Sequence, residues 1–193
     1  MQVTPEILKD CEFDDRRAQK NLYEIYFRMH MSLCFSYYGN EEDARAVLNM
    51  GFLKVCRNIA TVNQNPKVFY SWSRKILVNT IIDDYRKNKK YLDSTDTREY
   101  DREMESTINS DYNQGMESLE EADIKKMIKM LPETARSVFM LYVVEGFNHR
   151  EIADALGINE GTSKWYLSIA RKQLRDMLER VEEIEAVLRK MVI

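Results

Sequence analysis

Residues 150–174 read REIADALGINEGTSKWYLSIARKQL, and this stretch has the pattern of two short helices joined at a tight corner. Asn148 and Glu151 form a capping-box pattern that opens the first helix. Gly157 marks the end of that helix, and Asn159 is placed to cap the second one. Two capped helices with a glycine at the corner are typical of a helix-turn-helix. The alternative is that the two helices meet at the corner of a plain bundle.

The second helix of this pair has one apolar face and one polar, cationic face. Leu167, Ala170 and Leu174 recur at helical spacing, so they are expected to pack on the apolar residues Ile152 and Leu156 of the first helix. Six other side chains are expected on its exposed or partly exposed sides: Thr162, Lys164, Trp165, Ser168, Arg171 and Lys172. The second helix of a helix-turn-helix enters the major groove of DNA by its N-terminal part. We therefore predict that these six residues bind DNA.

The composition of the whole chain favours helices over strands. Apolar residues make up 44% of the 193 residues, which is enough to build packed cores. There are only six glycines and three prolines, and long stretches are rich in Leu, Met, Ala, Glu, Lys and Arg. Few segments alternate between apolar and polar residues at a period of two. The sequence therefore predicts an all-α fold.

Few residues are available for metal or histidine-based chemistry. Cys11, Cys34 and Cys56 lack CxxC spacing, so neither a disulfide framework nor a zinc site is expected. His30 and His149 are far apart and have no partner at a ligand-like spacing. We therefore expect no metal, no cofactor and no enzymatic activity. No apolar run is long enough for a membrane span, and the N-terminus lacks a basic-then-apolar signal pattern, so we expect a cytoplasmic protein without membrane insertion.

Charge is segregated along the chain. The formal net charge is −3 and the isoelectric point is about 5.6, whereas a nucleic-acid-binding domain is usually basic. Residues 93–123 hold eleven acids and only two arginines. Basic runs lie on either side of this segment, RKNKK at residues 86–90 and ARKQLR at residues 170–175. The acidic average therefore hides two basic patches that flank an acidic middle.

The acidic segment is expected to separate two domains. Residues 92–117 have few aliphatic side chains, and their charge excess disfavours a packed core. A linker of this length is uncommon inside one compact domain. We therefore predict a first small helical domain at residues 1–91, a flexible acidic linker at residues 92–117 and a second helical domain at residues 118–193.

Three helices are expected in the first domain. One helix ends at Gly39, and the next begins at residues 41–43, whose acids suit the positive end of a helix dipole. Gly51 lies inside this second helix, which predicts that another part of the chain approaches closely there. The third helix, at residues 69–90, has a polar face formed by Lys75, Asn79, Asp83, Arg86 and Lys90.

Two long stretches of the chain resemble a known protein family. Residues 131–178 resemble region four of bacterial RNA polymerase sigma factors, because LP, an apolar helix, EG, EIA, LG and GT follow in the family's order. Residues 41–59 are similar to the polymerase-docking helix of region two, and residues 69–90 to its promoter-melting helix. The order of the two regions matches the extracytoplasmic-function class of the sigma-70 family. The resemblance implies a sigma factor whose partners are core RNA polymerase, promoter DNA and a candidate anti-sigma factor.

The resemblance implies that the second domain reads the minus-thirty-five promoter element as duplex DNA. Lys164, Trp165 and Ser168 occupy positions at which the family contacts bases. Arg171 and Lys172 occupy positions that lie nearer the phosphates. The chain departs from the family where Trp165 and Tyr166 replace small polar and basic residues and Ser163 replaces an apolar one. Two interpretations of Trp165 stay open: it packs on a thymine methyl group, or it covers the domain core.

The resemblance also implies that the first domain captures the unpaired non-template strand of the minus-ten element. The residues expected to bind this strand are Asn63, Gln64, Asn65, Lys67, Lys75, Asn79, Arg86 and Lys87. Amides at residues 63–65 can hydrogen-bond a base edge, and Phe69, Tyr70 and Trp72 follow closely in the sequence. Core packing is the alternative for Trp72, because Ile76 follows it by one helical turn. For the basic tail the alternative is a solvated helix end.

By the same resemblance, polymerase docking falls to the helix at residues 41–59. The side chains expected to dock are Leu48, Asn49, Phe52 and Leu53. Family members commonly have acidic residues and a glutamine here, whereas this chain has Ala46, Asn49 and Met50. We therefore expect docking with an altered electrostatic part.

The linker and the C-terminal end each have more than one interpretation. The linker is expected either to run through the RNA-exit path of the polymerase, as linkers of this family do, or to act as a flexible tether. Beyond the helix-turn-helix, two sets of residues share heptad positions, Leu174, Val181 and Leu188 in one and Met177, Ile184 and Met191 in the other. This heptad stripe pairs with a second copy, binds an anti-sigma partner, or folds back on its own domain.

Two other classes of protein compete with the sigma factor. One is a helix-turn-helix transcriptional regulator whose N-terminal helices bind a ligand or dimerise, and it would bind duplex promoter tightly by itself. The other is a helical enzyme or scaffold, which would need paired carboxylates or a histidine-centred site. A sigma factor should need core polymerase and should favour the melted non-template strand.

Overall fold

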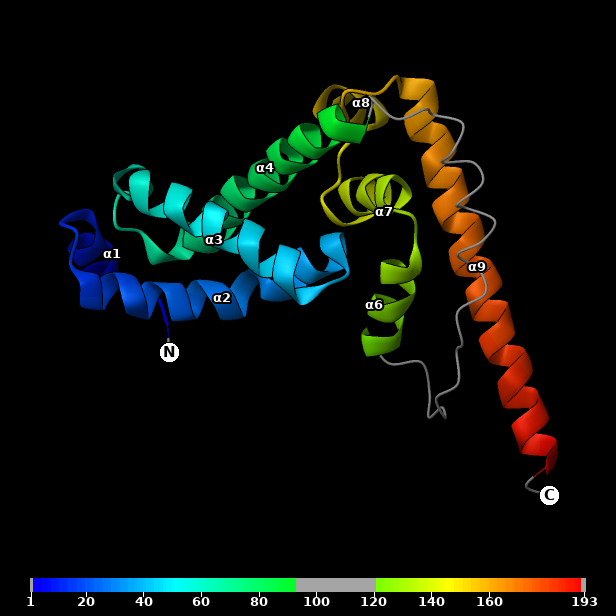
Figure 1. Ribbon diagram of the computed structural model, residues 1–193. Coiled ribbons are helices and arrows are strands. Elements are labelled where there is room, and N and C mark those ends of the chain that lie inside the picture. Colours follow the sequence, from blue (N-terminus) through cyan, green and yellow to red (C-terminus); the bar gives the residue numbers. More distant parts are fainter. Residues whose placement is uncertain (1, 93–120, 192–193) are drawn as a thin grey trace. The chain divides into compact units, whose positions relative to one another are not determined.

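The computed structural model describes residues 2–92 and 121–191, with side chains described for residues 2–88 and 123–181 (Figure 1). Every regular element in these ranges is a helix, which confirms the predicted all-α fold. The chain divides into two compact units, Met1–Asn88 and Lys89–Ile193. Of the predicted linker, only Leu92 falls among the described residues, where it ends a helix. No described helix is both long and apolar enough to cross a membrane.

The first unit is built from four α-helices and one short 3-10 helix. Their bounds are α1 Pro5–Glu12, α2 Arg16–Tyr38, α3 Glu41–Arg57, η1 Ile59–Val62 and α4 Pro66–Leu92. The sequence predicted α2, α3 and α4 but missed α1. The signal for α1 was present, because Thr4 caps the helix by accepting the Ile7 N–H at 3.2 Å and Pro5 occupies its first position.

The corner between α2 and α3 follows from local sequence signals. Gly39 ends α2 with a left-handed φ of 76°, a conformation that glycine adopts without steric cost. Asn40 then caps α3, because its Oδ1 accepts the Asp43 N–H at 2.9 Å. The predicted break at Gly39 and the predicted start at residues 41–43 are both confirmed.

The core of the first unit forms between α2, α3 and α4, whose side chains meet around Gly51. Tyr26, Phe69 and Leu77 are all 0% exposed there. A Cβ at Gly51 would lie 2.7 Å from the Tyr26 Oη and 2.8 Å from the Leu77 Cδ1, so only glycine fits between these side chains without a shift. The close approach predicted at Gly51 is confirmed.

Replacing Gly51 with leucine is expected to destabilise the first unit by about 1–3 kcal/mol, because a packed core resists added methylenes. Urea denaturation in a Trp165→Phe background, followed by the fluorescence of Trp72, measures the change. Ala46→Leu is the matched control, since Ala46 is exposed on the same helix and the added side chain reaches solvent. Equal stabilities for the two variants would contradict the packing described here.

A buried polar pair also joins α2 to α4. His30 is 0% exposed, its Nε2 lies 2.8 Å from the Ser73 Oγ, and its ring stacks on Tyr70 with centroids 5.3 Å apart. Burial lowers the pKa of His30 to about 4, so the ring is neutral at pH 7. His30 is therefore part of the core.

The second unit contains the predicted helices and one feature that was not predicted. The elements are α6 Glu121–Met130, α7 Glu133–Phe139, the π-helix η3 Met140–Val144, α8 His149–Leu156 and α9 Glu160–Met191. Pro132 precedes α7 as its N-cap residue. In the π-helix the Glu145 N–H donates to the Met140 carbonyl at 3.1 Å, a wider turn than the sequence pattern indicated.

The helix-turn-helix has the caps that the sequence predicted. The capping box of α8 is complete, with the Glu151 N–H on the Asn148 side chain at 2.9 Å and the Asn148 N–H on the Glu151 carboxylate at 2.8 Å. Gly157 has a left-handed φ of 64°, and Asn159 accepts the Thr162 N–H at 2.7 Å. These caps fix the corner between α8 and α9.

Burial in α8 and α9 also follows the predicted faces. Ile152 and Leu156 are 0% and 1% exposed, and Leu167 and Ala170 are 3% and 0% exposed. Leu174 is half-buried against the same core. Helix α9 therefore buries the expected apolar face. Ala170 and Leu174 pack with Leu131 and with Ala135 of α7, so this part of the face does not rest on α8 as expected.

Helix α9 continues as one element far beyond the helix-turn-helix, to Met191. Of the predicted heptad stripe, Leu174 and Met177 are half-buried and Val181 is 2% exposed. The side chains at its last three positions lie outside the described residues, so the role of the stripe stays a prediction.

Candidate nucleic-acid interface

The first part of α9 presents the predicted DNA-binding side chains to solvent. Thr162 is half-buried, and the exposed members are Lys164, Trp165, Ser168, Arg171 and Lys172. Trp165 is 48% exposed, and its ring meets Tyr166 edge to face with centroids 4.9 Å apart. About half of Trp165 is covered, and Tyr166 in turn packs against the domain core, so both interpretations of Trp165 stay open.

Lys164 is already paired within the same helix. Its Nζ lies 2.6 Å from the Glu160 Oε1, and the hydrogen bond from Lys164 lowers the pKa of Glu160. Both side chains are more than half exposed, so the pair is weak and Lys164 can exchange Glu160 for DNA at little cost.

Ser163 is buried where the family pattern has an apolar residue, and the structure explains this departure. Ser163 is 0% exposed, and its Oγ lies 3.0 Å from the His149 Nδ1 at the start of α8. The polar side chain is therefore satisfied by a hydrogen bond across the corner.

His149 in turn connects to a cation on α9 through an aromatic ring. The His149 and Tyr142 rings stack with centroids 4.7 Å apart and planes at 27°. The Arg171 guanidinium lies over the Tyr142 ring, 5.6 Å from its centroid. This series of contacts, from Ser163 to Arg171, is named here the aromatic relay. Sequence reasoning missed Tyr142 and His149, and the only signal was the polar Ser163 at an apolar position.

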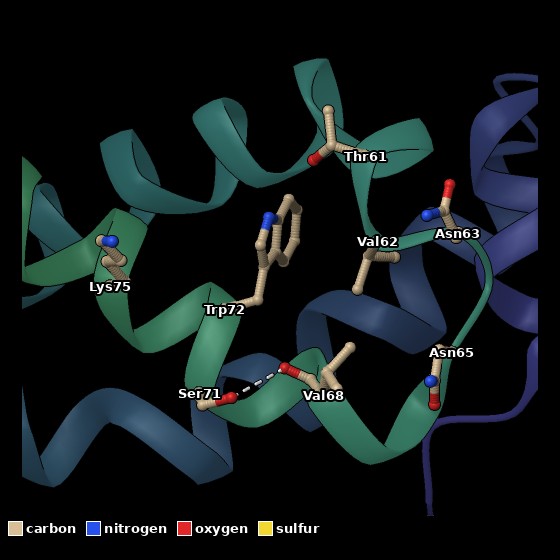
Figure 2. A pocket seen from close by; sticks show the side chains of 8 residues that line it. All are labelled: Thr61, Val62, Asn63, Asn65, Val68, Ser71, Trp72 and Lys75. Carbon is tan, nitrogen blue, oxygen red and sulfur yellow. Dashed lines mark hydrogen bonds between the residues drawn. The ribbon is translucent and has the colours of Figure 1, made fainter.

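The first unit has an open pocket of about 400 Å³ between η1 and the start of α4 (Figure 2). It is lined by Thr61, Val62, Asn63, Asn65, Val68, Ser71, Trp72 and Lys75. Figure 2 shows the Trp72 indole standing between the η1 side chains and Lys75. The volume is in the range of about 300–1,000 Å³ that is usual for small-molecule sites.

The aromatic residues near the pocket differ from the sequence expectation in their burial. Phe69 is 0% exposed and belongs to the core, whereas Trp72 is half-buried and lines the pocket. Tyr70 is 44% exposed and stacks on His30. Core packing therefore describes Phe69 fully and Trp72 only in part.

The pocket brings together three of the eight residues predicted to bind the unpaired strand: Asn63, Asn65 and Lys75. Lys67 lies in the first turn of α4, and its backbone N–H donates to the Asn65 Oδ1 at 3.0 Å. The Gln64 amide donates to Glu12 of α1 at 3.1 Å. The other members are exposed farther along α4: Asn79, Arg86 and Lys87.

The face of α3 predicted to dock the polymerase needs one correction. Leu48 is 0% exposed and belongs to the core, so it cannot form part of a docking surface. Asn49 is exposed and its Oδ1 accepts the Tyr23 hydroxyl at 2.8 Å. Leu53 and Met50 are 58% and 38% exposed. The helical spacing placed Leu48 on the correct element but could not say which side of α3 faces inward.

Phe52 lies at the edge of this surface. It is half-buried, and its ring meets Tyr23 edge to face with centroids 5.1 Å apart. We call Asn49, Met50, Phe52 and Leu53 the α3 outer face. Met50 is the member that the sequence prediction left out.

Comparison with known proteins adds independent information. The family model described as Sigma-70 region 2 matches residues 22–91, and that of Sigma-70, region 4 matches residues 121–174. The ECF RNA polymerase sigma factor SigW of Bacillus subtilis is 30% identical over 88% of this chain and 96% of its own length. The ECF RNA polymerase sigma factor SigE of Mycolicibacterium smegmatis is 28% identical over 86% of this chain, which spans 60% of the length of that relative.

A solved structure also matches most of the length of this chain. It is the sigma factor RpoE of Bartonella quintana in complex with the anti-sigma factor NepR, with a TM-score of 0.45 and 20% identity over 83% of this chain and 96% of RpoE.

The two matched regions, in this order, define a transcription initiation factor of the two-region type. The chain belongs to the extracytoplasmic-function class of the sigma-70 family.

Proposed function

We propose that this sigma factor directs core RNA polymerase to promoters by holding the unpaired minus-ten strand in the first unit and gripping the minus-thirty-five duplex with the second. The observation that carries this proposal is the pocket beside Trp72, lined by amides and a lysine, on the same chain as a helix-turn-helix with an exposed cationic face. The role is one of binding, and the proposal includes no reaction catalysed by the chain itself.

In the duplex-binding half, α9 supplies both base and phosphate contacts. Trp165 offers an exposed apolar ring that suits a thymine methyl group, and Lys164 and Ser168 offer donors to base edges. Arg171 and Lys172 lie farther along the helix and are assigned to phosphates. Tyr142 is added as the residue that orients Arg171.

Replacing Tyr142 with alanine is expected to weaken binding to minus-thirty-five duplex about two- to fivefold, because an exposed cation–π contact is worth about 0.5–1 kcal/mol. Tyr142→Phe keeps the ring and should bind as the wild type does. Fluorescence anisotropy of the holoenzyme on labelled duplex measures both variants. Equal losses for alanine and phenylalanine would assign the effect to the hydroxyl and contradict the aromatic relay.

In the strand-binding half, the pocket accommodates one unpaired base. Flipping a base out of the duplex costs a few kcal/mol, and stacking on an aromatic side chain recovers about 1–3 kcal/mol of that cost. Trp72 supplies the aromatic ring, and Asn63 and Asn65 supply amide donors and acceptors for the base edge. Lys75, with Asn79, Arg86 and Lys87 along α4, is assigned to the strand beyond the pocket.

The α3 outer face is assigned to core RNA polymerase. Leu53 and Met50 expose apolar surface beside the amide of Asn49, a combination that suits a protein partner better than DNA. The anti-sigma partner stays a prediction. The path of the linker through the polymerase concerns residues outside the described ones.

A run-off transcription assay with purified core RNA polymerase and genomic templates tests the proposed function. Initiation at discrete sites that requires both core polymerase and this chain is the expected result. Tight binding to duplex promoter by the chain alone, with no polymerase-dependent initiation, would favour the helix-turn-helix regulator and contradict the proposal.

A further inference from the structure

Helix α1 lies outside the part of the chain that matches the family model, which begins at residue 22. It packs against α2 and against η1, the 3-10 helix that forms one wall of the pocket. Its side chains Leu8 and Cys11 are 1% and 2% exposed, so α1 is firmly seated on the unit. The helix therefore supports the pocket from behind the loop at residues 63–65.

That loop has a backbone that needs support. Asn63 and Gln64 are consecutive non-glycine residues with left-handed φ values of 49° and 53°. Such residues are uncommon because the Cβ is crowded by the backbone, and they persist where surrounding contacts hold them. Backbone bonds hold each side of the turn, from the Asn63 N–H to the Ala60 carbonyl at 3.2 Å and from the Asn65 N–H to the Val62 carbonyl at 3.1 Å.

The side chain at the centre of the loop is directed to α1. The Gln64 Nε2 donates to the Glu12 Oε2 at 3.1 Å, across 52 positions in the sequence. Gln64 is absent from the pocket lining, while its neighbours Asn63 and Asn65 are both part of it. The Gln64 side chain is thus bound to α1, while the side chains of its two neighbours face the pocket.

The surface around Glu12 is unsuited to contact with DNA itself. Glu12 is followed by the exposed residues Asp14 and Asp15, and carboxylates repel a phosphate backbone. Both aspartates have structural partners, since Asp14 accepts the Gln19 amide at 3.2 Å and Asp15 accepts the Ala18 N–H at 2.7 Å. An effect of Glu12 on the choice among bases is therefore expected to act through the loop, whereas its charge alone would change the affinity for every base equally.

We propose that α1 is a strut for the base-reading loop, and that Glu12 is a positioning residue that holds Gln64 so that Asn63 and Asn65 face the base. Gln64 is then a tether and does not read the base. This inference rests on the proposed function of the pocket. Loss of the tether lets the loop leave its left-handed conformation, so the two amides lose their fixed direction and the choice among bases weakens.

The test uses the full chain bound to core RNA polymerase and single-stranded minus-ten oligonucleotides that differ at one nucleotide. The measured quantity is the ratio of affinities for the best and worst base, which reports the choice among bases separately from overall binding. Glu12→Ala is expected to lower this ratio about fivefold, because a change of that size corresponds to the net free energy of about one hydrogen bond. Glu12→Gln keeps an oxygen that accepts the Gln64 amide and should retain the ratio.

Two further variants separate the tether from other effects. Glu6→Ala removes an exposed carboxylate from the same helix and should leave the ratio unchanged. Gln64→Ala should lower the ratio as much as Glu12→Ala does, and the double variant should lower it no further, because both changes remove one interaction. A Gln64→Ala loss without a Glu12→Ala loss would make Gln64 a base reader and overturn the inference.

Other outcomes also overturn it. A Glu12→Ala variant that keeps the wild-type ratio of affinities overturns the inference. A Glu12→Ala variant that loses affinity equally for every base also overturns it, because such a loss indicates a change in folding or charge alone. A wild-type holoenzyme that binds all four bases equally would overturn the proposed function, and the strut with it. If the wild-type holoenzyme discriminates among bases and Glu12→Ala keeps the same ratio of affinities, the role of α1 as a strut is overturned and the proposed function of the pocket is not.

Discussion

Replacing Leu156 with alanine is expected to destabilise the second unit by about 2–5 kcal/mol, because truncating a buried leucine loses its transfer free energy and leaves a cavity. Leu156 is 1% exposed and packs at the corner of the helix-turn-helix. A loss of this size is a large share of the stability of a small domain. The variant should therefore lose affinity for duplex promoter DNA at moderate temperature.

Urea denaturation of the full chain measures this change. The chain has two tryptophans, and a Trp72→Phe background leaves Trp165 as the fluorescent reporter of the second unit. Val144→Ala is the matched control, since Val144 is 45% exposed and its truncation should change stability by no more than about 0.5 kcal/mol. If Leu156→Ala unfolds at the same midpoint urea concentration as the wild type, Leu156 does not belong to a packed core at the corner of the helix-turn-helix.

Replacing Trp72 with alanine is expected to weaken binding of the holoenzyme to unpaired minus-ten strand about 10- to 100-fold, from the loss of about 1–3 kcal/mol of stacking. Trp72→Phe keeps an aromatic face and should recover most of the affinity. Tyr70→Ala is the control, because Tyr70 is a neighbouring exposed aromatic residue that stacks on His30 and does not line the pocket.

Anisotropy of a labelled single-stranded oligonucleotide measures the three variants, and thermal unfolding shows whether each one folds. The account would be wrong if Tyr70→Ala lost as much affinity as Trp72→Ala, or if the alanine at position 72 bound as well as the wild type.

The helix boundaries were predictable because their causes are local. Gly39 and Gly157 adopt left-handed φ values at the ends where they were expected, and Asn148 caps α8 with Glu151. The close approach at Gly51 was also predictable, since a glycine inside a helix needs a reason that its neighbours supply. Resemblance to the family supplied the order of the two regions.

The features that were missed depend on tertiary contacts. Helical spacing put Leu48 on α3 and Trp72 on α4, but apolar residues occur on several sides of both helices, so spacing alone could not fix their burial. The stacking of Arg171 on Tyr142 joins residues from two separate helices. The hydrogen bond between Glu12 and Gln64 joins residues that are 52 positions apart in the sequence, so no local pattern indicates it.

The central claim is that the two units bind different states of the promoter, and one crossed affinity measurement tests it most directly. Holoenzymes with Trp72→Ala or Trp165→Ala are each titrated with a minus-thirty-five duplex and with an unpaired minus-ten strand. We predict that Trp72→Ala loses affinity only for the strand and Trp165→Ala only for the duplex. Equal losses of both variants on both DNAs would contradict the account.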